Sequence, residues 1–334
     1  TYSVFSELFS QLVRPEGRAG FIVPTGIATD DSNKVFFGAM VEENRLVSLY
    51  DFENREKIFP AVDSRYKFSL LTLSGASRGA EAARFGFFLT RTAHLQDEMR
   101  IFNLTKDDFL RLNPNTRTCP VFRTRVDAEL TAAIYRRMPI LVNENTGENP
   151  WGVKFMTMFH MSNDSHLFRT RPQMEAEGFA LMGNRFVRGE EVWLPLYEAK
   201  MIWHYDHRFG NYEGVESRQG SQLPTPLISD YTTPEFSVIP WYWVNSIEIS
   251  KYGGNYRVGF RDIARNTDER TALFSFFPKC GVSNKMPVIL LEGSYELYAY
   301  FASAVCSIVF DYVARQKIGG TSLNFFYVKQ FPLI

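Results

Sequence analysis

The run Ala19-Gly20-Phe21-Ile22-Val23-Pro24 decides how the first part of the chain folds. Before it, apolar residues recur from Val4 to Leu12 at intervals of three and four, which predicts a helix that ends before Pro15-Glu16-Gly17. The apolar run itself predicts a strand buried on both faces, as in a sheet that helices cover on both sides.

The following segments continue this alternation of helix and strand. Residues 30–32 are favourable caps for a helix over about 33–43, and residues 46–52 and 67–73 have the composition of strands. Such alternation is typical of a doubly wound α/β sheet. Because the apolar face of the first helix requires a strand to cover, we expect the chain to start partway through an α/β domain.

The second half of the sequence has a different character. Residues 127–138 predict a helix, and a polar loop follows at 143–150. A last helix is expected over about 294–317, ending at Gly319-Gly320. Between them, short aromatic and β-branched segments predict strands at 153–159, 191–193, 241–244, 256–260 and 271–277. This pattern indicates a mixed, β-rich α+β region.

Composition excludes several classes of protein. The 334 residues carry 37 Lys and Arg against 37 Asp and Glu and are 45% hydrophobic, which excludes a disordered or collagen-like polymer. The three cysteines, Cys119, Cys280 and Cys306, are too widely spaced for a zinc site and fit a reducing compartment, so we expect a cytoplasmic protein. No apolar run reaches the ~18 residues of a membrane span, so no membrane partner is expected.

The familiar catalytic motifs do not occur in the sequence. It has no GxGxxG, no GxxxxGK[ST], no HExxH and no CxxC pair. His204 and His207 lie three apart without a third ligand at a suitable spacing, which favours a surface or hydrogen-bonding role. No metal site is therefore predicted.

The most suggestive cluster is basic. Arg257, Arg261, Arg265 and Arg270 fall within fourteen residues and alternate with aromatic and amide side chains. Arginine forms bidentate hydrogen bonds with guanine or phosphate, so this mixture suits a nucleic-acid surface. A solvated face with ion pairs to neighbouring acids explains the same residues, and at this level both interpretations stay open.

Several blocks resemble adenine-specific DNA methyltransferases that act on the exocyclic amine. Gly17-Arg18-Ala19-Gly20-Phe21-Ile22-Val23-Pro24-Thr25 is similar to the segment downstream of their catalytic loop, and residues 49–54, 59–60 and 67–71 resemble the late strands of the same domain. Blocks at 113–125, 195–208 and 259–271 resemble one branch, which holds the fused restriction–modification (type IIG) enzymes and the phage-exclusion methylases. Residues 318–332 resemble the close of their target-recognition domains.

The resemblance implies a fold and a division of the chain. Residues 1–110 would be the truncated tail of a doubly wound methyltransferase sheet, and residues 111–334 a connector and a mixed, β-rich target-recognition domain. The implied function is recognition of a DNA sequence for adenine methylation in a restriction–modification or phage-defence system. The implied partners are double-stranded DNA and upstream catalytic, and possibly nuclease, domains of the same polypeptide.

The resemblance also implies S-adenosylmethionine as the methyl donor of the full-length protein. Neither the Asn-Pro-Pro-Tyr or Asp-Pro-Pro-Tyr loop nor the Phe-x-Gly-x-Gly cofactor turn of the family occurs in these 334 residues. We therefore expect no cofactor on this chain, no catalytic residue in it, and no activity of the chain by itself.

The resemblance assigns candidate residues for contact with DNA. Phe59 matches the position whose ring stacks on the extruded base, although it could equally pack a hairpin. The DNA-binding candidates are Lys200, His207, Arg208, Arg257, Arg261, Arg265, Arg270 and Thr321. For Thr321 a plain helix C-cap is the competing interpretation.

Two other functions remain open from the sequence. The chain could be a stand-alone DNA-binding specificity protein that works with a separate catalytic subunit. Its 51 aromatic residues (30 Phe, 16 Tyr and 5 Trp) would also suit a carbohydrate-active enzyme, which requires two carboxylates beside an aromatic cleft.

Overall fold

The computed structural model describes residues 2–220, 222–253 and 256–333, which form two compact units. Unit 1 comprises Thr1–Glu148, Tyr312–Gly320 and Phe326–Ile334, and unit 2 comprises Asn149–Asp311 and Thr321–Phe325. Both units contain helices and sheets, in agreement with the mixed α/β and α+β classes that the sequence predicts. The compact units divide after residue 148 and not after residue 110, because residues 111–148 pack within unit 1. The assignment of 1–110 and 111–334 to a methyltransferase tail and a recognition domain stays a prediction.

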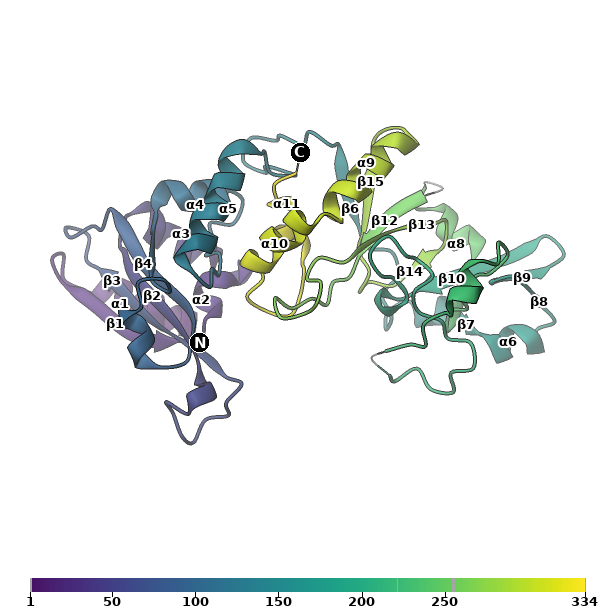
Figure 1. Cartoon of the computed structure of the whole chain (residues 1–334), viewed down its shortest axis with the longest axis horizontal. Helices are drawn as coiled ribbons and strands as arrows, with labels where there is room; N and C mark the ends of the chain where they lie inside the picture. Colours follow the sequence, from purple (N-terminus) through teal and green to yellow (C-terminus); the bar gives the residue numbers. More distant parts are fainter. Residues whose placement is uncertain (1, 221, 254–255, 334) are drawn as a thin grey trace. The chain divides into compact units, whose positions relative to one another are not determined.

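Unit 1 is built on a five-stranded sheet with the order β1-β3-β2-β4-β5 (Figure 1). Its strands are β1 (Arg18–Val23), β2 (Leu46–Glu53), β3 (Lys67–Ser74), β4 (Ala82–Leu89) and β5 (Phe102–Thr105). β3 pairs antiparallel with both β1 and β2, whereas β2 and β4 are parallel, so β1, β2 and β4 all run in one direction. Their carboxyl ends therefore share one edge, called here the carboxyl edge of unit 1.

Two capping boxes start helices of unit 1. Thr105 and Asp108 cap α4 reciprocally, and Thr124 and Asp127 do the same for α5, so each helix begins with two of its free N–H groups satisfied. The helices of this unit are α1 (Tyr2–Leu12), α2 (Gly26–Thr29), α3 (Lys34–Glu42), α4 (Lys106–Leu112), α5 (Arg125–Arg137), most of α10 (Ile308–Lys317) and most of α11 (Phe325–Lys329); short 3-10 turns cover Asp31–Asn33, Asn54–Glu56 and Thr92–Gln96.

Lys317, at the end of α10, is a buried cation within unit 1. Its exposed fraction is 1%, and its Nζ donates to the main-chain carbonyls of Leu112 and, at 2.9 Å, Gln330. The same nitrogen lies 4.4 Å from the ring centre of Tyr135. One amine thus joins the returning C-terminal segments to α4 and α5.

Unit 2 contains two sheets. The larger has the order β7-β11-β10-β9-β8 with β14 parallel to β10, and the smaller has the antiparallel order β13-β12-β15-β6 (Figure 1). The strands are β6 (Val153–Met156), β7 (Phe168–Thr170), β8 (Ala180–Met182), β9 (Arg185–Arg188), β10 (Glu191–Tyr197), β11 (Tyr242–Asn245), β12 (Tyr256–Phe260), β13 (Phe274–Pro278), β14 (Gly281–Val282) and β15 (Val288–Leu291). The helices are α6 (Arg171–Ala176), α7 (Ile228–Tyr231), α8 (Ser246–Ser250) and α9 (Tyr295–Val305), with 3-10 turns at Ser165–Leu167 and Ala199–Met201.

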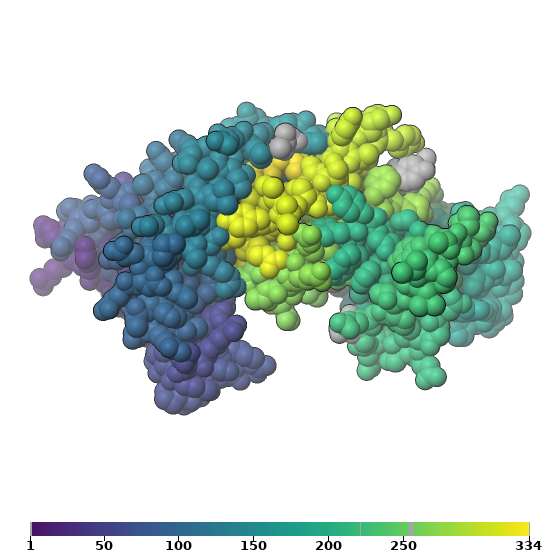
Figure 2. Space-filling view, in the orientation of Figure 1, coloured from purple at the N-terminus to yellow at the C-terminus, as the bar shows by residue number. Residues whose placement is uncertain are grey.

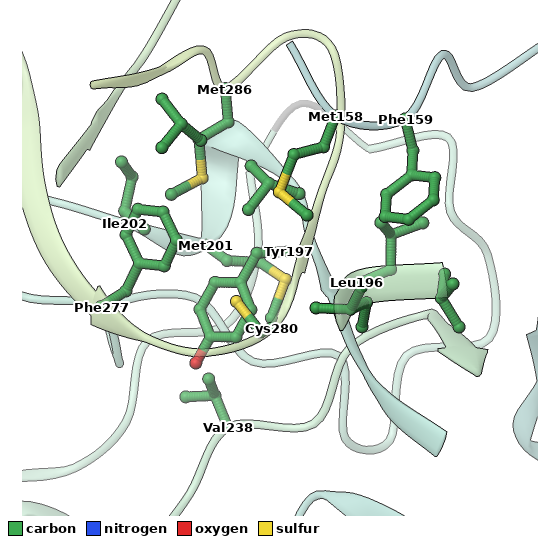
Figure 3. Close-up of a cluster of buried hydrophobic side chains, with 14 of the residues drawn as sticks. Met158, Phe159, Leu196, Tyr197, Met201, Ile202, Val238, Phe277, Cys280 and Met286 are labelled. Carbon is green, nitrogen blue, oxygen red and sulfur yellow. The ribbon is translucent and has the colours of Figure 1, made fainter. Parts of the chain in front are cut away.

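The core of unit 2 lies where β10, β14 and the turn after β13 meet. Leu196, Tyr197, Met201, Phe277 and Cys280 belong to one buried cluster (Figure 3). A second, smaller cluster packs the hairpin of β8 and β9 onto β11, with Phe186 and Trp243 edge-to-face and their ring centres 4.9 Å apart.

Two expectations from the sequence are wrong. The strand at 19–24 is not buried on both faces: Phe21 packs against Phe9 of α1, whereas Ile22, which points to the opposite face, is 56% exposed. The last helix is not continuous either, since Cys306 and Ser307 separate α9 from α10. Apolar composition alone does not distinguish a strand covered on both faces from one covered on a single face, nor a straight helix from a bent one.

None of the described helices is by itself long and apolar enough to cross a membrane. α9 and α10 have the length and composition for it only as a pair, and a bend of 60° separates them.

Replacing Lys317 with methionine should change how stability depends on pH. Burial lowers the pKa of Lys317 well below its usual range, so the unfolded chain binds this proton more tightly than the folded one. The free energy of unfolding should therefore rise with pH from the lowered pKa of the folded protein to the normal value of about 10.4 in the unfolded chain. Lys317→Met should lack this rise.

The measurement is urea unfolding of both proteins from about pH 6 to about pH 10. Lys34→Met is the control, because Lys34 is a partly exposed lysine that pairs with Asp31. Parallel pH curves for wild type and Lys317→Met would contradict the assigned cost of burying this amine.

Candidate nucleic-acid interface

Phe59 lies in the segment between β2 and β3, which projects beyond the carboxyl end of β2 in Figure 1 and protrudes at the lower end of unit 1 in Figure 2. The fully buried Asn54 organises this segment. Its Nδ2 donates to the carbonyls of Phe59 and Val62 at 3.0 and 2.9 Å, and its Oδ1 accepts from the Phe59 N–H at 2.9 Å. The Phe59 ring remains 38% exposed and meets Phe68 edge-to-face with 4.9 Å between ring centres.

A buried polar group lies at the carboxyl edge of unit 1. Asp51 is 2% exposed; its Oδ1 accepts from the Thr25 hydroxyl and its Oδ2 from the Phe88 N–H at 3.4 Å. The Ser69 hydroxyl donates to Thr25 Oγ1 at 3.3 Å. Burial raises the pKa of Asp51, and the charge of Lys67 opposes that rise.

Two cations lie over the ring of Phe88 at the end of β4. Lys67 Nζ is 4.6 Å and the guanidinium carbon of Arg123 is 4.1 Å from the ring centre. Phe88 has a φ of +56°, a left-handed conformation that is uncommon for a bulky residue and tends to occur at turns and functional sites. Lys67 also pairs with Glu53 at 3.2 Å, whereas Arg123 is exposed. The carboxyl edge thus combines one buried acid, two cations and aromatic rings.

Arg257, a DNA-binding candidate from the sequence, lies inside unit 2. It is 0% exposed and donates to the main-chain carbonyls of Cys280 at 2.8 Å and Gly253 at 2.6 Å. Burial lowers its pKa. No part of this side chain reaches the surface, so in this structure Arg257 is not accessible to DNA. Its hydrogen bond to Cys280 instead supports the turn after β13.

Arg261 is also largely internal. Its Nε donates to the carbonyls of Ala199 and Ile202 at 3.0 and 3.1 Å, and its Nη2 donates to Ile202 at 2.6 Å. The guanidinium carbon lies 5.0 Å from the ring centre of Trp203, and burial lowers the pKa of Arg261 to about 10. Its hydrogen bonds therefore hold the segment after β10 in place.

Arg265, Arg270 and Thr321 are brought together by backbone contacts. The Ala264 N–H donates to the Thr321 carbonyl at 3.1 Å, and the Thr271 hydroxyl donates to the Arg265 carbonyl at 3.1 Å. Arg265 and Thr321 are exposed and Arg270 is half-buried. The segment after β12 is not helical, so these residues meet through a closed loop and not along a helix face.

The remaining candidates flank a long loop of unit 2. Lys200 Nζ donates to two carbonyls of the 218–220 segment, at 3.1 and 2.8 Å, and burial lowers its pKa. The guanidinium carbon of Arg208 lies 5.0 Å from the ring centre of Tyr231. His207 is half-buried, and burial, assisted by the charge of Arg208, lowers its pKa. Lys200 thus anchors the loop, while Arg208 and His207 retain partial access to solvent.

The ring nitrogens of His204 do not have the surface or hydrogen-bonding role expected from the sequence. Both ring nitrogens of His204 are buried without a hydrogen-bond partner, and burial followed by the charge of Arg270 lowers its pKa. Within the described residues, no group of three or more His, Cys, Asp or Glu side chains is placed to hold a metal ion.

An open cavity of about 430 Å³ in unit 2 has an aromatic wall. Its lining includes Tyr212, Trp241 and Trp243 together with Glu213 and Glu216. The carbohydrate alternative requires an aromatic cleft of this kind together with two carboxyl groups about 5 to 9.5 Å apart.

The sequence analysis did not single out the group around Asp51 and Phe88. Lys67 and Arg123 are far apart in the chain. The sheet brings Lys67 of β3 to Phe88 of β4, whereas Arg123 reaches the same ring from the segment before α5. A polar Asp within the apolar strand 46–52 is the one signal in the sequence that could have pointed to this edge.

Comparison with solved structures gives distant likenesses. No protein-family model matches the sequence, and no curated protein matches it. A solved structure with similarity to the chain is that of the type IIG restriction endonuclease BpuSI, at 13% sequence identity and a TM-score of 0.36. The match covers 99% of this chain and 41% of that one, so the chain spans about two fifths of the length of that enzyme. A likeness of this size carries no conclusion about function.

Arg261→Met should destabilise the protein. The substitution leaves the carbonyls of Ala199 and Ile202 without their donor, at an expected cost of about 2–3 kcal/mol in the free energy of unfolding. The control Arg265→Met removes an exposed guanidinium and should change that free energy by less than about 0.5 kcal/mol. Urea unfolding followed by circular dichroism measures both, and equal midpoints would contradict the internal role of Arg261.

Asn54→Ala should loosen the segment that carries Phe59. Loss of the amide removes its hydrogen bonds to Phe59 and Val62, so trypsin should cut after Lys57 or Arg65 at least about tenfold faster than in wild type, which corresponds to ~1.4 kcal/mol of local opening. Asn103→Ala, an exposed asparagine on β5, is the control. Identical cleavage rates in both variants would show that Asn54 does not order the segment.

Proposed function

We propose that this chain recognises duplex DNA as the C-terminal part of an enzyme that methylates the exocyclic amine of adenine, in a restriction–modification or phage-exclusion system. In this proposal unit 1 holds the end of the catalytic domain and unit 2 the target-recognition surface. S-adenosylmethionine would bind upstream segments of the complete protein. The sequence contains neither the family's Pro-Pro-Tyr loop nor its cofactor turn, so these residues alone do not fit the cofactor.

The observation that carries the proposal is the carboxyl edge of unit 1. Open α/β sheets bind their ligands outside the carboxyl ends of their parallel strands. At this edge Asn54 holds Phe59 half-exposed, and Lys67 and Arg123 supply positive charge. A base extruded from a duplex loses its stacking, and an aromatic ring restores about 1–3 kcal/mol of it. The cations would attract the phosphates of the same strand.

The outer side of unit 1 supports its place in a larger sheet. Among the described residues, β1 pairs with β3 alone, so the other side of β1 lacks a strand partner. α1 turns Ser6 and Ser10 inward, whereas its apolar residues Val4, Phe5, Leu8, Phe9 and Leu12 are exposed. An apolar face turned outward beside an open strand edge is expected where further structure packs.

The loop that joins Arg265, Arg270 and Thr321 supplies the contact with DNA in unit 2. These are the predicted residues that lie close to one another and keep access to solvent. Arg208 and His207 would add a second contact. Arg257 and Arg261 act behind this surface, because their donors are directed at main-chain carbonyls.

The 334-residue chain should bind duplex DNA with an affinity that falls steeply with salt. Each phosphate contact contributes about 0.9 to the slope of log K against log salt, so Arg265→Gln with Arg270→Gln should reduce the slope by about 2 and weaken binding about tenfold. Fluorescence anisotropy with labelled duplexes at several salt concentrations measures both quantities. Lys34→Gln with Arg100→Gln is a control of equal charge, on residues already paired with acids.

Other outcomes distinguish the alternatives. Binding that does not depend on salt, or an unchanged slope in the Arg265 and Arg270 variant, would contradict the proposed surface. Binding of oligosaccharides at the cavity beside Trp241, without binding of DNA, would favour the carbohydrate alternative. Methylation that depends on a separately encoded subunit would favour a stand-alone specificity protein.

A further inference from the structure

A second cavity in unit 2, of about 440 Å³, is lined by none of the candidate residues named from the sequence. One wall is the turn between β8 and β9, with Asn184 and Arg185, and the other is the turn after β13, with Lys279. Tyr295, the first residue of α9, lies at its border, and Tyr197 and Cys280 line it from within the buried cluster of Figure 3.

The charged side chains that line this cavity are basic. Arg185 and Lys279 both line it, and its described lining contains neither Asp nor Glu. In the described part of the chain neither cation forms an ion pair, whereas Arg188 on the same strand pairs with Glu191 at 3.1 Å. Arg185 is exposed and Lys279 is half-buried, so their charged ends are available to a ligand at the mouth.

The wall that carries Arg185 is rigid. Gly183, with a φ of +63°, is the first residue of the two-residue turn, where left-handed geometry gives a tight hairpin. The Trp243 Nε1–H donates to the Asn184 carbonyl at 2.8 Å, and Phe186 next to Arg185 is fully buried. The start of the Arg185 side chain is therefore fixed, while its end remains free to reach a ligand.

The wall that carries Lys279 is held from inside. The buried Arg257 donates to the carbonyl of Cys280, the next residue, at 2.8 Å. Gly281 then pairs with Leu196 of β10 in parallel register. Arg257 is thus a positioning residue for the Lys279 turn, which gives a physical role to a buried arginine within the basic cluster.

Two basic side chains that line one cavity without an acidic neighbour in its described lining suit a compact anion. A guanidinium forms two parallel hydrogen bonds with phosphate, and an ammonium adds a point charge. We propose that this cavity binds a phosphate group. The inference rests on the proposed function, in which this phosphate belongs to the DNA backbone. The contact would set the register of unit 2 on the duplex without reading a base.

The test uses two double variants. One carries both Arg185→Gln and Lys279→Gln, and the control carries both Lys154→Gln and Lys251→Gln. The control removes the same charge from residues that pair with Glu292 and Glu248. The Arg185 and Lys279 variant should bind duplex DNA about tenfold more weakly than wild type, with a salt slope smaller by about 2, while the control stays close to wild type. Urea unfolding verifies that both variants are folded.

A second arm uses inorganic phosphate, compared with chloride at equal ionic strength. Phosphate should raise the unfolding temperature of wild type but not of the Arg185 and Lys279 variant. If DNA binding is equal in variant and control, the inference is overturned and the proposed function stands. If wild type binds no DNA but phosphate stabilises it through these residues, the phosphate site stands and the proposed function falls. If wild type binds no DNA and phosphate does not stabilise it, both are overturned.

Discussion

The interior of each unit depends on basic side chains that donate to main-chain carbonyls. Lys317 does this in unit 1, and Arg257 and Arg261 do it in unit 2. Burying a basic group is costly unless its N–H groups find acceptors, so these side chains tie together segments that are distant in the chain, although the Nε of Arg257 has no partner within the described residues. Because these basic groups donate to internal carbonyls, they are not exposed at the surface. The positive charge available to a partner is therefore smaller than the count of arginines and lysines suggests.

The two candidate surfaces follow from different constraints. In unit 1, strand direction gathers side chains at one edge, because β1, β2 and β4 are parallel while β3 lies between β1 and β2. In unit 2, turns and loops present the exposed cations, and buried residues such as Trp243 and Arg257 hold those turns. In the function that we propose, the first surface would accept the extruded base and the second would grip the backbone of the duplex.

Local pattern predicted many elements well. The apolar periodicity near residue 4 and the helix expected over 127–138 correspond to α1 and α5, and the strands expected at 46–52 and 67–73 are β2 and β3. The same reasoning failed for burial. β1 has the apolar composition of a buried strand, yet Ile22 is exposed, because exposure depends on what packs on each face of the sheet. The arginine cluster failed similarly: its spacing is visible in the sequence, but the carbonyls that accept from Arg257 and Arg261 come from other segments.

The sequence by itself determined the alternation of helices and strands, the neutral total charge and the family resemblance, since these depend on residues near one another in the chain. Only the tertiary structure decided which cations are internal and which are exposed. It also placed Lys67 and Arg123 over Phe88 and brought Arg185 and Lys279 to one cavity. The physical reason is that burial and charge pairing are properties of segments brought together from distant parts of the chain, and no local pattern records them.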